Sequence, residues 1–276
     1  MWDYPLIYST NSKRVAIFGV GVVNGGGNSP PGHLVKKYEE STNFLYPQDL
    51  PFPGCSPFSC RVKLVVFFNC SDVLLSGVSL INSPLWTLEF SLSKNIQVSN
   101  CYISTDRRWP NGDGIDIVSS SHVTISNTTI STGDDNIDVS THVVGYPSED
   151  IVVEGCTLSS TSCSQNIGMF SMENISRVVW KDNVVVGSNR GAGIMPRIGN
   201  GSIHDISYLN ISISTRQYSE AWWGNGEPIY VCNLFFNFES FPSSFFLLDL
   251  CFSFQLDDKL WRKSFLYSLQ KRHRYL

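Results

Sequence analysis

Residues 123–130, Val-Thr-Ile-Ser-Asn-Thr-Thr-Ile, decide the fold, because the same eight-residue pattern recurs along the chain. Each copy has an apolar residue at position 1, Gly, Asn or Asp at position 5, and an apolar residue at position 8. The copies begin at Val15, Val73, Ile96, Val123, Ile151, Val178 and Ile206, and the last six follow one another at intervals of 23 to 28 residues. A repeat of this length is typical of a solenoid.

Position 5 predicts how each copy turns. The residues there tolerate a positive φ angle at a sharp bend; they are Gly19, Gly77, Asn100, Asn127, Gly155, Asp182 and Asn210. Position 8 starts a second strand; its residues are Val22, Leu80, Ile103, Ile130, Leu158, Val185 and Ile213. One copy cannot bury its apolar face alone, so the copies must stack. We therefore predict an all-β chain, a right-handed parallel β-helix with a continuous aliphatic interior. An antiparallel sandwich would lack the fixed bend residue at a long period.

A third row of strands carries acidic residues. Its first apolar residues are expected at Ile115, Ile137, Ile167 and Ile194. Aligning Ile115 with Ile137 places Asp113 opposite Asp135, with Asp134 beside them. Asp116 and Asp138 alternate with the buried residues and should face outward.

This carboxylate cluster has three interpretations. Each aspartate alone would more often form a turn, and several carboxylates together can bind Ca²⁺. Like charges on adjacent strands cost stability, however, so turn formation does not explain why three occur in register. Two carboxyls whose pKa values differ can act as acid and base, and we therefore favour catalysis.

Three short motifs resemble glycoside hydrolase family 28, the polygalacturonases and related pectin-degrading enzymes, and especially the plant polygalacturonase-like members. The motifs are NGDG at 111–114, GDDN at 133–136 and PRIG at 196–199, and the segment 222–230 is also similar. The similarity covers roughly residues 10–232. It implies inverting hydrolysis of a pectic, galacturonan-type polysaccharide by a monomeric protein, without a cofactor or metal.

The resemblance also implies residue roles. Asp134 would be the general acid, while Asp113 and Asp135 would activate the water. Inversion is expected to need an acid and a base about 6.5–9.5 Å apart. Substrate binding is assigned to Arg197, Gln165, Asn111 and Asp116.

Some positions depart from the family pattern. Aligning Ile167 with the other strands puts Gln165 in place of a histidine, and Gly199 stands in place of a lysine. Glutamine cannot titrate, and one cation fewer weakens recognition of an acidic sugar. The alternative function is therefore a catalytically impaired β-helix protein that binds cell-wall polysaccharide. Asn136 replaces a cysteine, which we interpret as a change in packing.

Composition limits the other function classes. The net charge of −4 gives no basic surface for nucleic acid, and no apolar run reaches the ~18 residues of a membrane span. The start of the chain lacks the features of a signal peptide. By resemblance the protein is nevertheless expected to be secreted, to the extracellular space or cell wall, with a truncated N-terminus. Five glycosylation sequons support that route only weakly; they are at Asn69, Asn127, Asn174, Asn200 and Asn210.

The domain division follows the repeat. Residues 1–232 are expected to form the β-helix, incomplete at the N-terminus and with a Pro/Gly-rich insertion at 24–60. Residues 233–276 lack glycine and are rich in Phe and Leu, so we expect an atypical tail that packs poorly and lies outside the family fold.

The cysteine spacing suggests both local disulfides and buried thiols, and Cys156 is considered for each. A local disulfide is plausible for Cys55 with Cys60, and Cys156 with Cys163 could close a short loop in the same way. Cys101 and Cys156 occupy equivalent positions two coils apart, at about 9–10 Å, which is beyond disulfide reach. These two are expected to be buried thiols.

Overall fold

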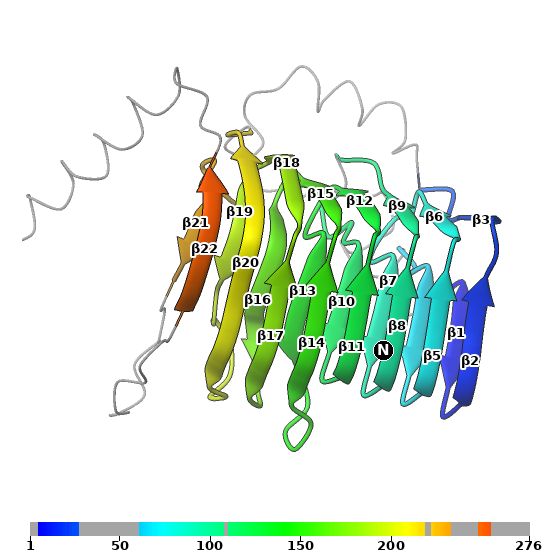
Figure 1. Ribbon diagram of the computed structural model, residues 1–276. Coiled ribbons are helices and arrows are strands. Elements are labelled where there is room, and N and C mark those ends of the chain that lie inside the picture. The colour runs from blue at the N-terminus through cyan, green and yellow to red at the C-terminus, as the bar shows by residue number, and fades with distance from the viewer. Residues whose placement is uncertain (1–4, 28–60, 108–109, 219–221, 233–247, 255–276) are drawn as a thin grey trace, which may run out of the picture.

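The chain forms a stack of β-coils, as Figure 1 shows from the side. The computed structural model describes residues 5–27, 61–107, 110–218, 222–232 and 248–254. Every named element within these ranges is a strand. Neighbouring coils contribute equivalent strands that pair in parallel, which confirms the predicted β-helix architecture.

One sheet has eight strands and carries the acidic motifs. Its order is β1-β4-β7-β10-β13-β16-β19-β21. The strands are β1 (Ile7–Thr10), β4 (Val65–Phe68), β7 (Leu88–Ser91), β10 (Ile115–Val118), β13 (Ile137–Thr141), β16 (Cys163–Ser171), β19 (Arg190–Ile194) and β21 (Ile229–Val231).

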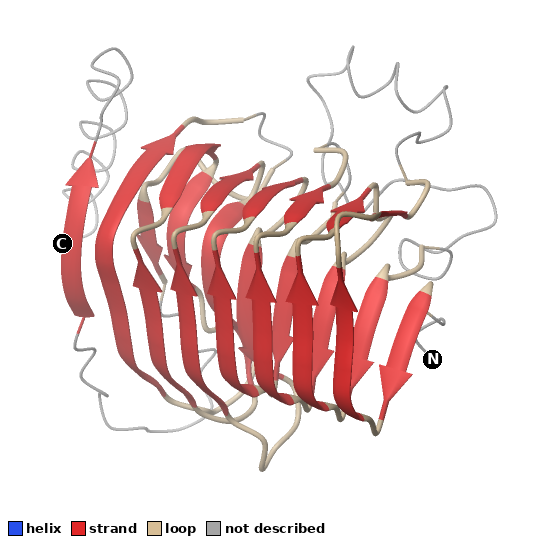
Figure 2. Cartoon of the chain, turned by 45° about the vertical axis from the view of Figure 1, so that its right-hand side comes forward, coloured by secondary structure: helices blue, strands red, loops and turns tan. Residues whose placement is uncertain are grey.

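The second sheet contains two rows of strands joined through one long strand, β20. The longer strands are β2 (Lys13–Phe18), β5 (Ser71–Ser76), β8 (Lys94–Ser99), β11 (Ser121–Ser126), β14 (Ser148–Glu154), β17 (Ile175–Lys181) and β20 (Ile203–Thr215). The shorter strands are β3 (Val22–Asn24), β6 (Ser79–Ile81), β9 (Tyr102–Ser104), β12 (Thr129–Thr132), β15 (Thr157–Ser160) and β18 (Val184–Ser188). β22 (Leu248–Phe254) pairs with β20. Figure 2 shows the two rows and the bend between them.

The strand register confirms the repeat. All seven position-1 residues oppose one another in sequence order, from Val15↔Val73 to Val178↔Ile206. Position 8 is confirmed from Leu80 onward. The prediction for Val22 is wrong, because Val23 opposes Leu80. The first coil has one more residue in its turn, which leaves Val22 exposed.

The bend residues are also confirmed. All seven have a positive φ, from Asn127 at 47° to Gly19 at 118°. In each coil, a second residue with a positive φ comes before the bend residue. These residues form a second left-handed row, at Arg14, Asp72, Asn95, His122, Asp150, Arg177 and Asp205. The sequence analysis missed this row because Arg14, His122 and Arg177 are not among the Gly, Asn and Asp types that mark position 5.

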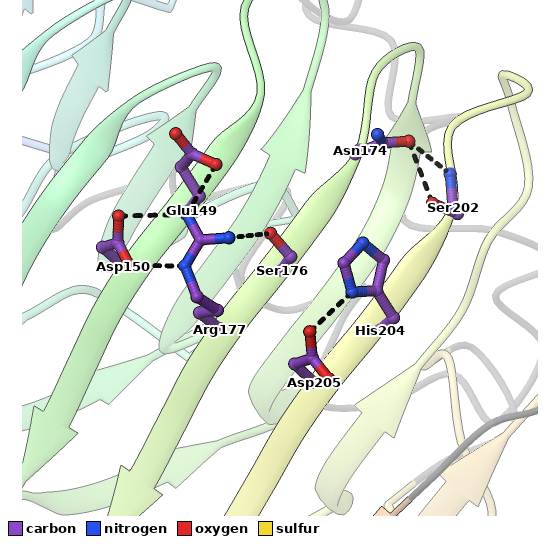
Figure 3. Close-up of polar contacts among 8 residues, drawn as sticks. All are labelled: Glu149, Asp150, Asn174, Ser176, Arg177, Ser202, His204 and Asp205. Carbon is purple, nitrogen blue, oxygen red and sulfur yellow. Dashed lines mark hydrogen bonds and ion pairs between the residues drawn. The ribbon is translucent and has the colours of Figure 1, made fainter.

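The second left-handed row places charged side chains on the outer face of the second sheet. Arg177 Nε lies 2.6 Å from Asp150 Oδ1, and its Nη2 lies 2.7 Å from Glu149 Oε2 (Figure 3). His122 Nε2 is 3.6 Å from the other oxygen of Asp150. On this exposed face, Arg177 thus pairs with two acids of the preceding coil.

The interior is mostly aliphatic, with aromatic and polar exceptions. Phe67 stacks on Phe90 at 5.5 Å between ring centroids, and Trp180 stacks on Tyr208 at 6.1 Å. Asn183 Nδ2 donates to Gln165 Oε1 at 3.3 Å, with both side chains fully buried. The predicted aliphatic interior is therefore interrupted by aromatic side chains at Phe67 and Phe90, and by aromatic and amide side chains in the later coils.

The cysteines of the described coils are free. Cys101 and Cys156 are buried thiols, as expected. A bond between Cys156 and Cys163 was a wrong prediction, because both are free. The predicted Cys55–Cys60 pair lies outside the described residues.

Two predictions about chain organisation fall partly outside the described residues. Of the insertion at 24–60, positions 28–60 are not described. Of the tail, positions 248–254 form β22, whose backbone pairs in parallel with β20 from Ile206 to Ile213. Among the described residues, no helix has the length and apolar character to cross a membrane.

Candidate active site

Three carboxyl groups converge at the edge of the eight-stranded sheet. Ile115 pairs with Ile137, so Asp113 and Asp135 lie in equivalent places on adjacent coils, as the sequence predicted. Asp113, Asp134 and Asp135 each contribute one carboxylate oxygen to a group lying within 4.8 Å of one another. Each residue is 6% exposed. These oxygens are closer together than the ~6.5–9.5 Å carboxyl separation expected for inversion.

The first motif holds Asp134 through its backbone. Asn111 has a φ of 54°, which asparagine tolerates better than most residues. Its N–H donates to Asp134 Oδ2 at 2.9 Å. Asn111 therefore positions a catalytic candidate, a role that differs from the substrate binding assigned by resemblance.

Gly114 allows the two motif coils to approach closely. A Cβ at this position would lie 2.4 Å from the Asn136 carbonyl oxygen and 2.6 Å from Ile130 Cγ2. The Gly114 N–H also donates to the Asp135 carbonyl at 2.9 Å. A side chain here would separate Asp113 from Asp135.

Hydroxyl groups hold the backbone of the GDDN motif at 133–136 through hydrogen bonds. Thr132 Oγ1 and Ser160 Oγ donate to the Asp134 carbonyl at 2.7 and 2.6 Å. Thr105 Oγ1 accepts from the Gly133 N–H and donates to the Gly112 carbonyl, both at 3.0 Å. Thr105 thus joins the two motifs directly.

The sequence analysis missed these hydroxyls, although a signal was present. Thr105, Thr132 and Ser160 each follow a position-8 residue by two places. Asn136, the replacement for a cysteine, donates to Thr132 Oγ1 at 2.6 Å and accepts from Ser164 Oγ at 2.8 Å. Its interior contacts agree with the predicted packing role.

Asp135 accepts three hydrogen bonds from protein donors. Its Oδ1 accepts from Ser162 Oγ at 2.9 Å and from the Cys163 N–H at 3.0 Å. Its Oδ2 accepts from Asn166 Nδ2 at 2.6 Å. Burial raises the pKa of Asp135, while these three hydrogen bonds and the nearby charge of Arg190 oppose the rise.

The carboxyl groups of Asp134 and Asp113 ionise less readily than an ordinary aspartate. Burial first, then the charge of Asp135, raises the pKa of Asp134 well above its usual range, and the Asn111 N–H opposes this. Burial and four neighbouring aspartates raise the pKa of Asp113 well above normal. Within the described ranges, Asp113 Oδ1 is buried without a hydrogen-bond partner. The cluster therefore combines one stabilised carboxylate with two groups that tend to keep a proton.

A second ladder of polar residues runs beside the three carboxyls. Glu89, Asp116, Asp138 and Asn166 oppose one another on β7, β10, β13 and β16. These residues alternate with the interior row, as expected, yet Asp116 is only 1% exposed. Lys63 forms an ion pair with Glu89 at one end of the ladder. Asp116 therefore lies in a buried carboxylate row.

The predicted place of Gln165 is wrong. Ile137 opposes Gln165, and Ile167 opposes Val139, so the register differs by two residues from the predicted alignment. Gln165 points into the interior, where it accepts from Asn183. The residue next to Asp135 on the adjacent coil is Cys163, whose backbone N–H donates to that carboxylate. The apolar Ile167 misled the alignment because an interior position can hold a paired amide.

Arg197 lies beyond the end of β19 and is exposed. The cation closer to the acids is Arg190, which opposes Cys163 and lowers the pKa of Asp135. Arg190 Nε lies 3.2 Å from Glu227 Oε2, and its guanidinium lies 3.8 Å from the Tyr230 ring centroid. The sequence contained a signal for it, since residues 135, 163 and 190 are one repeat apart.

A cation could in principle bridge Asp113, Asp134 and Asp135, because three carboxylate oxygens lie close together. Both oxygens of Asp135 and Oδ2 of Asp134 already accept hydrogen bonds from the protein. These donors occupy lone pairs that a cation would otherwise use.

Comparison with known proteins identifies the family. The sequence profile of Glycosyl hydrolases family 28 matches residues 7–219. The chain belongs to this family. This family 28 chain is 28% identical over 174 residues to a probable polygalacturonase of Vitis vinifera, covering 60% of the chain and 35% of that protein. It is 27% identical over 212 residues to a probable exopolygalacturonase B of Neosartorya fischeri, covering 73% of the chain and 43% of that protein.

Solved structures share the fold. An exopolygalacturonase from Thermotoga maritima superposes with a TM-score of 0.59 and 24% identity, covering 83% of this chain and 56% of that one. The polygalacturonase from Erwinia carotovora gives a TM-score of 0.56 at 17% identity, covering 83% and 70%. The chain spans less than half the length of the two curated relatives above.

Proposed function

We propose that this chain hydrolyses glycosidic bonds of pectic, galacturonan-type polysaccharide by an inverting carboxylate mechanism. The observation that carries hydrolysis is the convergence of Asp113, Asp134 and Asp135 within 4.8 Å on adjacent coils. The inverting stereochemistry rests on family membership instead, because these oxygens are closer than the separation expected for inversion. Family membership and the polygalacturonase names of the relatives support the substrate class.

Asp134 is assigned as the general acid. Hydrolysis needs a proton for the leaving oxygen, and burial beside Asp135 favours the protonated form of Asp134. The Asn111 N–H holds Oδ2 of Asp134, so the other oxygen can present the proton. The test of this role is loss of activity on changing the carboxyl to an amide.

Asp135 is assigned to water activation, with Asp113 as the second group. Three hydrogen bonds stabilise Asp135 as an anion, the form that a general base needs. Asp113 lies opposite it on the preceding coil. Water held between them would attack the anomeric carbon from the face opposite the leaving oxygen.

A direct assay tests the proposal. Purified protein is incubated with polygalacturonate, and reducing ends are measured beside Asp134→Asn and the matched control Asp205→Asn, whose carboxyl is exposed on the outer face. The expected result is release by wild type and the control only. Proton NMR of the first product then follows the anomer, and retained configuration would contradict inversion. No release above the Asp134→Asn background on any pectic substrate would overturn the function.

A polysaccharide-binding protein without catalysis is the second candidate. The small exposure of the three carboxyls, 6% each, supports it. Retained binding of polygalacturonate together with no reducing ends would favour it over the enzyme.

We also propose that the protein is secreted and acts as a monomer in the cell wall. All five sequon asparagines are exposed, which supports access by a glycosylating enzyme. Expression through a secretory pathway, followed by glycosidase treatment and a mass measurement, tests this; an unchanged mass would contradict glycosylation.

A further inference from the structure

Asn166 joins two carboxylates, Asp138 on β13 and Asp135, which lies two residues before that strand begins. Its side chain is fully buried, and its Nδ2 donates to Asp135 Oδ2 at 2.6 Å and to Asp138 Oδ1 at 2.9 Å. An amide nitrogen carries two hydrogens, so both bonds can form at once. The backbone register puts Asn166 directly opposite Asp138 on the adjacent coil.

The orientation of the Asn166 amide is fixed by these two acceptors. Turning it over would place Oδ1 against two carboxyl groups and remove both donors. In the observed orientation Oδ1 is buried and has no partner among the described residues. The two hydrogen bonds donated by Nδ2 therefore determine the orientation of the amide, because Oδ1 accepts none.

We propose that Asn166 and Asp138 are positioning residues that clamp Asp135 for the proposed hydrolysis. The inference rests on the proposed function, and it adds residues that act through Asp135. Ser162 and the Cys163 N–H hold Oδ1 of Asp135 from one side, while Asn166 holds Oδ2 from the other. The carboxylate plane is thereby fixed relative to Asp113, where the attacking water must lie.

Asp138 completes the clamp by holding the second amide hydrogen. It is buried, and the groups that face it are Asp116 on β10, Asp135 in the turn before β13, Ser140 and Asn166. Burial and the charge of Asp135 raise the pKa of Asp138 to about 8. In weakly acidic solution Asp138 is then neutral and accepts the hydrogen bond without repelling Asp135.

The first test removes the amide donors. Asn166→Leu keeps the approximate size of the side chain but donates nothing, so kcat should fall about 10- to 100-fold, as for other groups that orient a functional residue. KM should change little, because the clamp does not touch substrate. The matched control is Asn183→Leu, another buried amide, which bonds the Val153 carbonyl and Gln165 in the interior. An unchanged kcat in Asn166→Leu, or an equal fall in the control, would overturn the proposal.

The second test separates positioning from charge. Asp138→Asn still offers a carbonyl oxygen to Asn166 Nδ2 but cannot ionise, so kcat at pH near 6 should stay within about 3-fold of wild type. The alkaline limb of the kcat profile should move to higher pH, because no new charge appears beside Asp135. Asp138→Leu, which offers no acceptor, should behave like Asn166→Leu. Equal kcat and equal pH profiles in all three variants would contradict the clamp.

A third measurement does not depend on activity. Carboxyl titrations of ¹³C-labelled aspartate, followed by NMR, should show a higher pKa for Asp135 in Asn166→Leu than in wild type. An unchanged Asp135 titration would overturn the clamp even in an active enzyme. A shifted titration in a protein that releases no reducing ends would sustain the clamp and reject the proposed function.

Discussion

Asp138 and Asp150 are equivalent chemical groups, but the two sheets give them opposite environments. Asp138 is buried, lies next to Asp116 and Asp135, and its pKa rises to about 8. Asp150 lies on the outer face, where Arg177 hydrogen-bonds both of its oxygens and lowers its pKa. Acidic residues stack on the sheet that carries the candidate site. On the other sheet, Arg177 pairs with two acids of the preceding coil (Figure 3).

This difference shows where the chain accepts an energetic cost. Parallel coils repeat each position every ~4.8 Å, so any charged position must face its own equivalent on the next coil. On the outer face, an arginine on one coil next to an acid on the other replaces repulsion with attraction, as at Arg177 and Asp150. On the site sheet, acidic residues face acidic residues. The cost of burying them is reduced by protonation and by hydrogen-bond donors such as Asn166. Groups held against repulsion in this way are typical of functional sites.

The largest expected effect comes from removing one of the stacked acids. Asp113→Asn should lower activity about 10²- to 10⁴-fold, because it removes a group that helps to activate water. The unfolding midpoint at neutral pH should stay equal or rise, since an unpaired buried carboxyl is replaced by a neutral amide. Reducing-end assays and thermal unfolding measure the two quantities. A fall in both would mean that Asp113 serves the fold instead of the chemistry.

The pH dependence of stability should differ between the two sheets. The folded-state pKa of Asp138 is about 8 against 3.8 as its ordinary value, so the native state holds more protons in between. Its contribution to stability is therefore lost as pH rises through that window, by up to about 1.4 kcal/mol per pH unit. Chemical denaturation across the window should give a steeper fall for wild type than for Asp138→Asn. Parallel curves would contradict the raised pKa.

A crowded glycine tests how closely the site coils must approach. Gly114→Ala should lower the free energy of unfolding by about 1–3 kcal/mol, because the new Cβ would meet the Asn136 carbonyl at 2.4 Å. Activity per folded molecule should fall as well, since Asp113 moves from Asp135. Gly21→Ala is the control, because a Cβ there has nothing within 4 Å. Equal effects at both glycines would show that the crowding at Gly114 is relieved by small shifts.

The smallest effect is expected on the outer face. Asp150→Asn should lower the unfolding midpoint by no more than about 2–4 °C, because exposed ion pairs contribute little. Its pKa is lowered by Arg177, so its contribution exists above the ordinary aspartate pKa and is lost as pH falls through the folded-state value. High salt should reduce the difference from wild type. If Asp150→Asn lowered the unfolding midpoint more than Gly114→Ala does in the same thermal measurement, the contrast between the sheets would be contradicted.

Much of the fold could be predicted from the sequence because the repeat encodes it locally. The bend residues Gly77, Asn100 and Asn127 and the apolar residues before them satisfy the same local requirement in every coil. The pairing of Asp113 with Asp135 followed from the same alignment. These predictions needed only periodicity and the conformational preferences of glycine and asparagine.

The surroundings of the acids could not be predicted in the same way. Gln165 was expected beside Asp135, but an amide pair with Asn183 lets it occupy the interior row. Asn166 then takes the outward place and meets two carboxylates. Arg190 and Thr105 reach the site through side chains whose direction depends on neighbouring coils.

The sequence by itself determined the coil, its bends and the presence of three acids on adjacent turns, because those features depend on residues close together in the chain. Tertiary structure decided which acids are buried, which donors they receive and which cation lies near them. The physical reason is that burial and hydrogen bonding of a side chain are properties of the stacked coils around it. A change of two residues in register keeps each side chain on its own face but gives it a different neighbour on the next coil, as Gln165 shows by lying opposite Ile137.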